Sequence, residues 1–208
     1  MEIPGRFENE KRLTARIDAA FASEIRGPIR RRESPNWAEA ERRVRDALRD
    51  EQLAVFIVML LLFWDDWSSR LGIEVTRIGQ AEASKLGTDW VNQRSSTIAG
   101  QLIENIKGDL GASPDRLPTR SRAETVATSE VTRAGSAGVK KAQKEIEREG
   151  SVKMTRVWVT ERDAKVCPIC RPLDGQPEWV WSKEFLDGPY AHPNCRCELI
   201  LMKESDLK

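Results

Sequence analysis

Apolar side chains recur at helical spacing through most of residues 6–110. The first stretch has an apolar residue at every fourth position, at Leu13, Ile17, Phe21 and Ile25. This spacing aligns the side chains on one face of an α-helix, so it predicts an amphipathic helix. The pair Gly27-Pro28 combines a flexible residue with one that lacks an N–H, and it predicts the end of this helix.

A second helix is predicted to begin after Asn36, whose side chain can cap it, and to run from Trp37 to Trp67. It contains the longest apolar run of the chain, the twelve residues from Leu53 to Trp64. A helix that is apolar on all sides must be covered by other helices or by a partner chain. Twelve residues are too few to span a bilayer, so no membrane span is predicted.

Two more helical stretches are predicted, one around Ile73–Ile78 and one around Trp90–Ile106. They are delimited by four glycines, Gly72, Gly87, Gly108 and Gly111. The segment that follows contains Pro114 and Pro118 and predicts a linker at residues 111–119.

Beyond the linker the pattern changes twice. Ser121 and Glu124 have the form of a capping box, which predicts a helix that ends near Gly150. β-branched residues in rough alternation through residues 152–160 predict a strand, and Glu198–Met202 predicts a short closing strand after a turn-rich segment. The predicted fold is mainly α: an elongated helical assembly region, residues 1–110, followed by a small α+β module, residues 120–208.

The balance of charges excludes one class of partner contact. The chain has 34 Lys and Arg residues against 33 Asp and Glu residues, so no chain-wide positive field would hold it on nucleic acid or on a membrane. Contact with DNA or a partner would have to come from a local basic cluster, for which the weak candidates are Arg26, Arg30, Arg31 and Arg32. Residues 120–148 add seven cations against four carboxylates, although solvated helix faces explain the same charges.

The tail concentrates the donors that bind transition metals. The pattern is Cys167-x2-Cys170, then 21 residues, then His192-x2-Cys195-x-Cys197. A Cys-x2-Cys pair on a tight turn can place two thiolates on one metal, and zinc prefers four such ligands in a tetrahedron. The second half offers three donors for the two remaining positions, so the sequence leaves open which four of the five bind. A closed site of this kind is structural, and its binding energy would hold the turn-rich tail folded.

Other interpretations of the four cysteines stay open. They can form two disulfides or remain free buried thiols, and the metal can be catalytic rather than structural. The first residues lack the basic start and apolar core of a signal peptide, so we expect the chain to fold in a reducing cytoplasm. Clustered pairs at short spacing then favour a metal site over disulfides.

The tail contains the run Trp158-x4-Asp163-x3-Cys167-Pro168-x-Cys170-x3-Asp174-Gly175, followed by His192-Pro193-Asn194-Cys195-Arg196-Cys197. In this motif it closely resembles the C-terminal module of phage minor head proteins, the phage Mu F-like head-morphogenesis family. The preceding helix also resembles that of the family, through Arg122, Glu124, Thr125, Glu130, Arg133 and Ala134. The similarity covers about residues 120–200, and the helical first half carries no matching motif.

The resemblance implies a structural role rather than an enzyme, with no small-molecule substrate. Proteins of this family join the procapsid in few copies near the portal vertex and assist head assembly, DNA packaging or DNA delivery. The implied partners are the portal protein, capsid or scaffold proteins, and packaged DNA as a further candidate. The implied location is the virion, after assembly in the host cytoplasm.

A zinc-supported DNA-binding module or nuclease is the alternative. His-Pro-Asn beside paired cysteines is superficially similar to nucleases built on a metal-bound hairpin and helix. Such an enzyme needs a general base and a catalytic metal beyond a structural zinc. The chain has a single histidine, His192, which is already a candidate ligand, so the sequence favours a protein without catalytic residues.

Arg196 stands between Cys195 and Cys197. If both neighbours turn inward, its guanidinium is directed elsewhere and can bind a carboxylate in forked geometry, or a phosphate on DNA or on a partner. We expect an internal pair with one of the carboxylates nearby in sequence, Asp163, Asp174 or Glu198.

Overall fold

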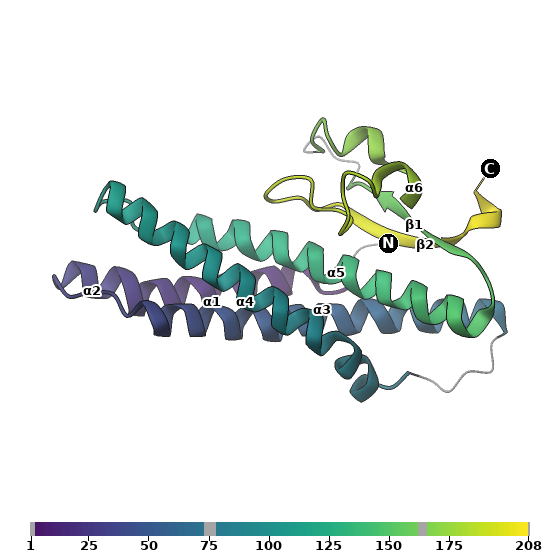
Figure 1. Ribbon diagram of the computed structural model, residues 1–208, viewed down its shortest axis with the longest axis horizontal. Helices are drawn as coiled ribbons and strands as arrows, with labels where there is room; N and C mark the ends of the chain where they lie inside the picture. Colours follow the sequence, from purple (N-terminus) through teal and green to yellow (C-terminus); the bar gives the residue numbers. More distant parts are fainter. Residues whose placement is uncertain (1–2, 73–77, 162–165, 208) are drawn as a thin grey trace.

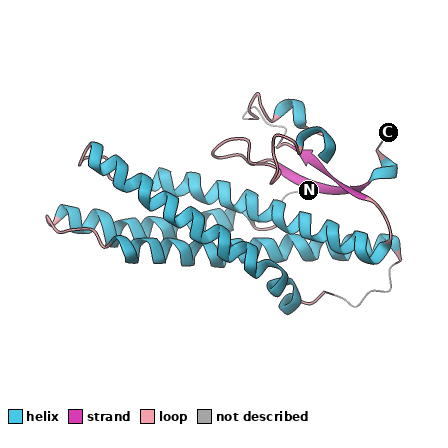
Figure 2. Cartoon of the chain, viewed as in Figure 1, coloured by secondary structure: helices cyan, strands magenta, loops and turns pink. Residues whose placement is uncertain are grey.

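The computed structural model describes residues 3–72, 78–161 and 166–207. Long helices pack along one another, and a two-stranded sheet with its connecting turns lies along one side of them (Figure 1). Figure 2 shows that strands are confined to this C-terminal part. The prediction of a mainly α protein with a small α+β module at its C-terminal end is confirmed. None of the helices in the described ranges is both long and apolar enough to cross a membrane.

The first helical arm runs past the predicted break. Helix α1 (Arg6–Phe21) continues through a π-helical turn (Ala22–Arg26) into the short helix α2 (Gly27–Arg30). The prediction that Gly27-Pro28 ends the helix was therefore wrong. The wider π turn directly before Pro28 leaves room for the proline ring and needs no N–H from it. The chain turns away only at Arg32, which has a left-handed φ of 61°.

Helix α3 (Trp37–Leu71) is the central element of the bundle. The predicted cap is confirmed, because Asn36 Oδ1 accepts a hydrogen bond from the Glu39 N–H at 3.1 Å. The helix ends four residues later than expected, at Leu71, and is followed by Gly72, whose φ of 61° suits a left-handed C-terminal cap. Most of its apolar run is covered within the chain by α1 and by the two long helices that follow, although Val58 is exposed.

Helix α4 (Gln80–Ala112) is continuous through the glycines that were expected to delimit it. Gly87 serves the packing of helices: a Cβ there would lie 2.6 Å from Cδ1 of Phe56 on α3. The separate stretch predicted around Ile73–Ile78 falls mostly outside the described residues. Because α4 includes residues 111 and 112, the connection to the next helix is formed by residues 113–119.

Helix α5 (Arg120–Gly150) packs against both α3 and α1. Its cap is Thr119, whose Oγ1 accepts a hydrogen bond from the Arg122 N–H at 3.3 Å, so the predicted capping box at Ser121 starts two residues too late. Small residues let α5 approach α3 closely. A Cβ on Gly138 would lie 2.6 Å from the Phe56 carbonyl oxygen and 2.9 Å from the Met59 Cβ.

Replacing Gly138 by alanine is expected to destabilise the protein by about 1–3 kcal/mol, because the added methyl group meets backbone that cannot yield. Gly100→Ala is the matched control, since Gly100 lies within α4 and a Cβ there meets nothing within 4 Å. The control is expected to stabilise by up to about 1 kcal/mol through helix propensity. Urea unfolding measures both variants, and equal effects of the two would contradict this account of the α3–α5 contact.

The C-terminal module is built on one antiparallel strand pair. Strands β1 (Met154–Val159) and β2 (Glu198–Lys203) pair with Val157 opposite Ile200, which confirms both predicted strands. The short helix α6 (Glu178–Trp181) packs against β1. Trp158 makes edge contacts with the rings of Trp181 and Phe185, at centroid distances of 5.7 and 5.3 Å. These aromatic side chains cover the inner face of the strand pair.

The core of the module continues into that of the bundle. Buried residues from Leu13 on α1 to Leu201 on β2 form one hydrophobic cluster. The division into separable units, residues 1–110 and 120–208, stays a prediction. The two units share core contacts, so they are not expected to separate without a cut in the chain.

Limited proteolysis is expected to cut first within residues 113–119, which lie outside regular secondary structure. Because α5 is buried against α3, the two fragments should still co-elute in size-exclusion chromatography. Earliest cuts within residues 166–200 of the metal-loaded protein would contradict this boundary.

Candidate metal centre

A tight turn presents the first two cysteines. The Cys170 N–H donates to the Cys167 Sγ at 3.2 Å, and the Arg171 N–H donates to the Cys167 carbonyl at 3.0 Å. Such N–H···S contacts stabilise negative charge on sulfur. The Cys170 side chain is buried and the Cys167 side chain is half-buried, so the turn directs both sulfurs toward the interior of the module.

A second loop, carrying His192 and Cys195, is held on helix α5. Asn194 adopts a left-handed φ of 62°, and the Cys195 N–H closes the turn onto the His192 carbonyl at 3.2 Å. The Cys195 carbonyl accepts a hydrogen bond from Thr132 Oγ1 at 2.7 Å, and the Asn194 N–H donates to Ser129 Oγ at 3.3 Å. The loop is thus positioned by side chains of α5 from about 60 residues earlier in the chain.

All five predicted ligands are brought together. The donor atoms of Cys167, Cys170 and His192 lie within 4.8 Å of one another, as do those of Cys170, Cys195 and Cys197. Cys170 belongs to both groups: its Sγ lies 3.7 Å from His192 Nε2 and 3.8 Å from Cys195 Sγ. Ligands about 2.3 Å from a tetrahedral zinc are about 3.8 Å apart, so these two separations fit ligands of one zinc ion.

The sulfurs alone hold little negative charge. Hydrogen bonds from Cys170 and Cys197 lower the pKa of Cys195 to about 2 in spite of its burial. The hydrogen bond to Cys195 in turn raises the pKa of Cys170, with burial adding to the effect. The contact with Cys170 lowers the pKa of Cys197, but the bond to Cys195 and burial outweigh it and raise that pKa to about 12. These hydrogen bonds favour the thiolate of Cys195 and the thiol of Cys170 and Cys197, and a bound cation would favour the thiolate form of all three.

The histidine ring is oriented for metal binding. His192 Nδ1 lies 2.8 Å from the Pro193 carbonyl oxygen, which can only accept a hydrogen bond. A ring that donates through Nδ1 leaves the lone pair of Nε2 free, and Nε2 is the atom that faces Cys170. All four cysteines are free thiols, without a disulfide among them. The donor set is therefore the Cys/His combination that structural zinc prefers.

The predicted basic cluster lies at the opposite end of the bundle from the strand pair (Figure 1). Arg26 is paired with Asp18 at 2.8 Å, and Arg31 is paired with Glu33 at 2.8 Å, whereas Arg30 and Arg32 are exposed. The structure thus does not join this cluster to the metal centre. Contact with DNA or a partner through it stays a prediction.

Arg196 forms an internal pair, though with another partner than expected. Its Nη2 lies 3.7 Å from Glu10 Oε2 on α1, and half of the side chain is exposed. Of the expected partners, Asp163 lies outside the described residues, Asp174 Oδ1 accepts the Thr160 N–H at 2.8 Å, and Glu198 is bound to Arg6. Among the described residues, Arg196 is therefore paired with the first helix.

Sequence analysis missed a buried ionic network beside the centre. Arg6 Nη1 donates to Glu198 Oε1 at 2.8 Å and to the Arg196 carbonyl at 2.9 Å, while Arg6 Nη2 donates to Thr132 Oγ1 at 2.6 Å. Arg6 and Glu198 are both at least nine-tenths buried. Burial raises the pKa of Glu198, although the Ile3 N–H and Arg6 oppose the shift. The only local signal was the i,i+4 spacing of Arg6 and Glu10.

The described chain is thus a helical protein whose small C-terminal module gathers five metal-type donors. A family model described as phage Mu protein F like protein matches residues 93–200, which are 108 of the 208 residues and include all five donors. The chain belongs to this family, which points to a phage head morphogenesis protein found in the virion. Comparison with curated proteins and with solved structures gives no match.

Proposed function

We propose that this chain is a structural minor head protein that acts at the portal vertex during procapsid assembly, DNA packaging or DNA delivery. The observation that carries the proposal is the family match, because it spans α5 and the whole Cys/His tail. The partners are portal and capsid or scaffold proteins. No substrate pocket is required for this role, and the tail serves as a rigid module fixed to the bundle by α5.

The second part of the proposal is a structural zinc ion in the tail. Cys170, His192 and Cys195 supply three ligands, since the Cys170 Sγ lies about as far from each of the other two donor atoms as ligands of one tetrahedral ion lie apart. The fourth ligand is Cys167 or Cys197, each of which shares one of the two groups with Cys170. Four protein ligands would close the site and leave no open position for a reacting water.

Procapsids made with and without this chain test the proposed role. Quantitative mass spectrometry of purified particles is expected to find the chain in few copies, and cryo-electron microscopy without imposed symmetry should show added density at the portal vertex. A Cys170→Ser chain serves as the comparison, because an unfolded tail should reduce incorporation of the chain into procapsids. Particles that never retain the wild-type chain would refute the role.

A cleavage assay with the purified protein distinguishes this structural role from that of a nuclease. Plasmid DNA incubated with the purified protein and magnesium is expected to stay intact. Cleavage by the wild-type protein that is lost in His192→Ala would instead favour a metal-dependent nuclease.

A further inference from the structure

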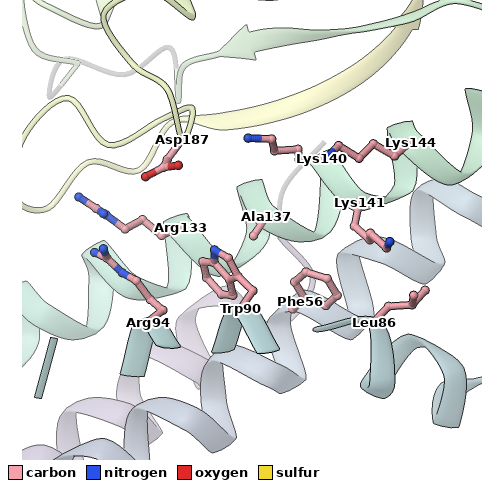
Figure 3. Close-up of a pocket in the computed structure, with 10 residues that line it drawn as sticks. All are labelled: Phe56, Leu86, Trp90, Arg94, Arg133, Ala137, Lys140, Lys141, Lys144 and Asp187. Carbon is pink, nitrogen blue, oxygen red and sulfur yellow. The ribbon is translucent and has the colours of Figure 1, made fainter. Parts of the chain in front are cut away.

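A groove of about 300 Å³ lies between α4 and α5, with Phe56 of α3 at its base (Figure 3). Leu86, Trp90 and Arg94 line it from α4 at successive turns of one helical face. Arg133, Ala137 and Lys140 line it from α5 at similar intervals, followed by Lys144 one turn later. Because eight residues separate Leu86 from Arg94, the groove is about 12 Å long, or roughly two turns of helix.

The floor of the groove is apolar. Phe56 of α3 forms its base and stacks on Trp90, with ring centroids 6.2 Å apart and planes inclined by 26°. Leu86 and Ala137 continue the floor on either side, and both are only half-buried. Half-buried aliphatic and aromatic groups of this kind favour the docking of an apolar side chain.

The walls carry an excess of positive charge. Three of the five lining cations already have carboxylate partners outside the groove: Arg94 pairs with Glu130 and Lys141 with Glu145, each at 2.8 Å, and Arg133 Nε lies 3.8 Å from Glu130 Oε1. Lys140 and Lys144 are the others, against a single lining carboxylate, Asp187. The Arg133 guanidinium lies 3.4 Å from the centre of the Tyr190 ring, and its Nε is buried without a hydrogen-bond partner. Burial and the neighbouring Arg94 lower the pKa of Arg133, so its charge is only partly compensated.

We propose that this groove binds an acidic amphipathic helix of a partner protein. Its apolar side chains would lie on the floor formed by Phe56 and Trp90, and its carboxylates would pair with Lys140 and Lys144. An amphipathic helix laid into a groove between two helices is a common mode of peptide recognition, with anchors at i, i+4 and i+7. Charge complementarity selects an acidic helix over a basic one.

Nucleic acid fits the groove less well. Phosphates need cations but no apolar floor, and a duplex is too wide to reach Phe56 at the base. Stacking of a single-stranded base on Trp90 is the remaining form of nucleic-acid binding, and the test below includes it. The proposal names the chemistry of a partner and thus rests on the proposed assembly role, but its outcome is separate from incorporation into procapsids.

The test uses the full-length, metal-loaded protein and a fluorescein-labelled synthetic helix of about 18 residues, with Glu on one face and Leu and Phe at i, i+4 and i+7 of the other. Fluorescence anisotropy is expected to show binding that weakens about tenfold in Lys140→Ser/Lys144→Ser. Lys11→Ser/Lys153→Ser is the matched control, because it removes two exposed lysines outside the groove, and it should bind like the wild type. A peptide of the same composition in scrambled order, and one with Lys in place of Glu, should bind at least about tenfold more weakly.

Trp90→Ala probes the apolar floor and is expected to weaken binding about tenfold while its circular dichroism stays helical. Equal binding by the two double-lysine variants, or none at about 1 mM peptide, would overturn the proposal. Tighter binding of an oligothymidylate, sensitive to Lys140 and Trp90, would assign the groove to single-stranded nucleic acid instead. If the peptide fails while the chain still enters procapsids, the groove proposal alone is lost.

Discussion

Protein purified without chelator is expected to carry about one zinc ion per chain, and removal of that ion is expected to unfold the C-terminal module. Structural zinc contributes an apparent binding free energy of about 10–16 kcal/mol in small domains, which is larger than the net stability of most domains. Between Cys167 and Cys197 the only α-helix is the four-residue α6, so backbone hydrogen bonds within regular structure would hold little of this segment without metal. Elemental analysis gives the stoichiometry, and limited proteolysis with and without chelator gives the state of the tail.

The bundle provides an internal control in this experiment. Most members of the buried core lie on these helices rather than in the Cys/His tail, so most of the helical circular dichroism should survive chelation. Among variants, Cys170→Ser is expected to abolish zinc binding, because Cys170 is the member common to both donor groups. Cys167→Ser and Cys197→Ser should differ in zinc binding, with one variant losing the ion and the other keeping it, since only one of these residues is needed as fourth ligand. A metal-free preparation with four free thiols and a protease-resistant tail would contradict the zinc site.

Local patterns predicted the elements that depend on neighbours in the chain. The helix from Trp37 was predictable because Asn36 caps it directly, and the five donors were predictable because Cys-x2-Cys and His-x2-Cys bring their members together through short turns. The strand pair followed from β-branched alternation in residues 152–160. The cap, the alternation within each strand and the spacing within each half of the donor set are local features, and spacing carries information about such features.

Errors arose where a residue serves a distant contact or where the helix changes its local geometry. Gly87 reads as a helix breaker, yet its lack of a side chain is used by the Phe56 ring of another helix. Pro28 reads as a terminator, yet a π turn lets the helix pass through it. The hydrogen bond that positions the metal loop joins Thr132 to Cys195, 63 positions apart, and no periodicity in the sequence predicts such a contact. Tertiary packing decides these positions, so a single sequence underdetermines them.

Loss of the Arg6 side chain is expected to have the second large effect on stability. Arg6→Met keeps much of the side-chain volume but leaves the carboxylate of Glu198 buried without its cation, which costs about 3–5 kcal/mol. Arg120→Ala is the matched control, because its pair with Glu124 is exposed and worth at most about 0.5 kcal/mol. Urea unfolding of the zinc-loaded proteins measures the difference, and Arg6→Met/Glu198→Gln should recover part of the loss by removing the stranded charge.

The same substitution should weaken the metal centre, because Arg6 reaches it by two routes. Its Nη1 donates to the carbonyl of Arg196, which lies between Cys195 and Cys197, and its Nη2 donates to Thr132, the residue that holds the Cys195 carbonyl. Groups that orient metal ligands typically change metal affinity by about 10–100-fold when removed. Competition with a zinc chelator should therefore extract the ion from Arg6→Met more readily than from Arg120→Ala. Equal zinc retention in the two variants would show that the first helix stabilises the fold without supporting the metal loop.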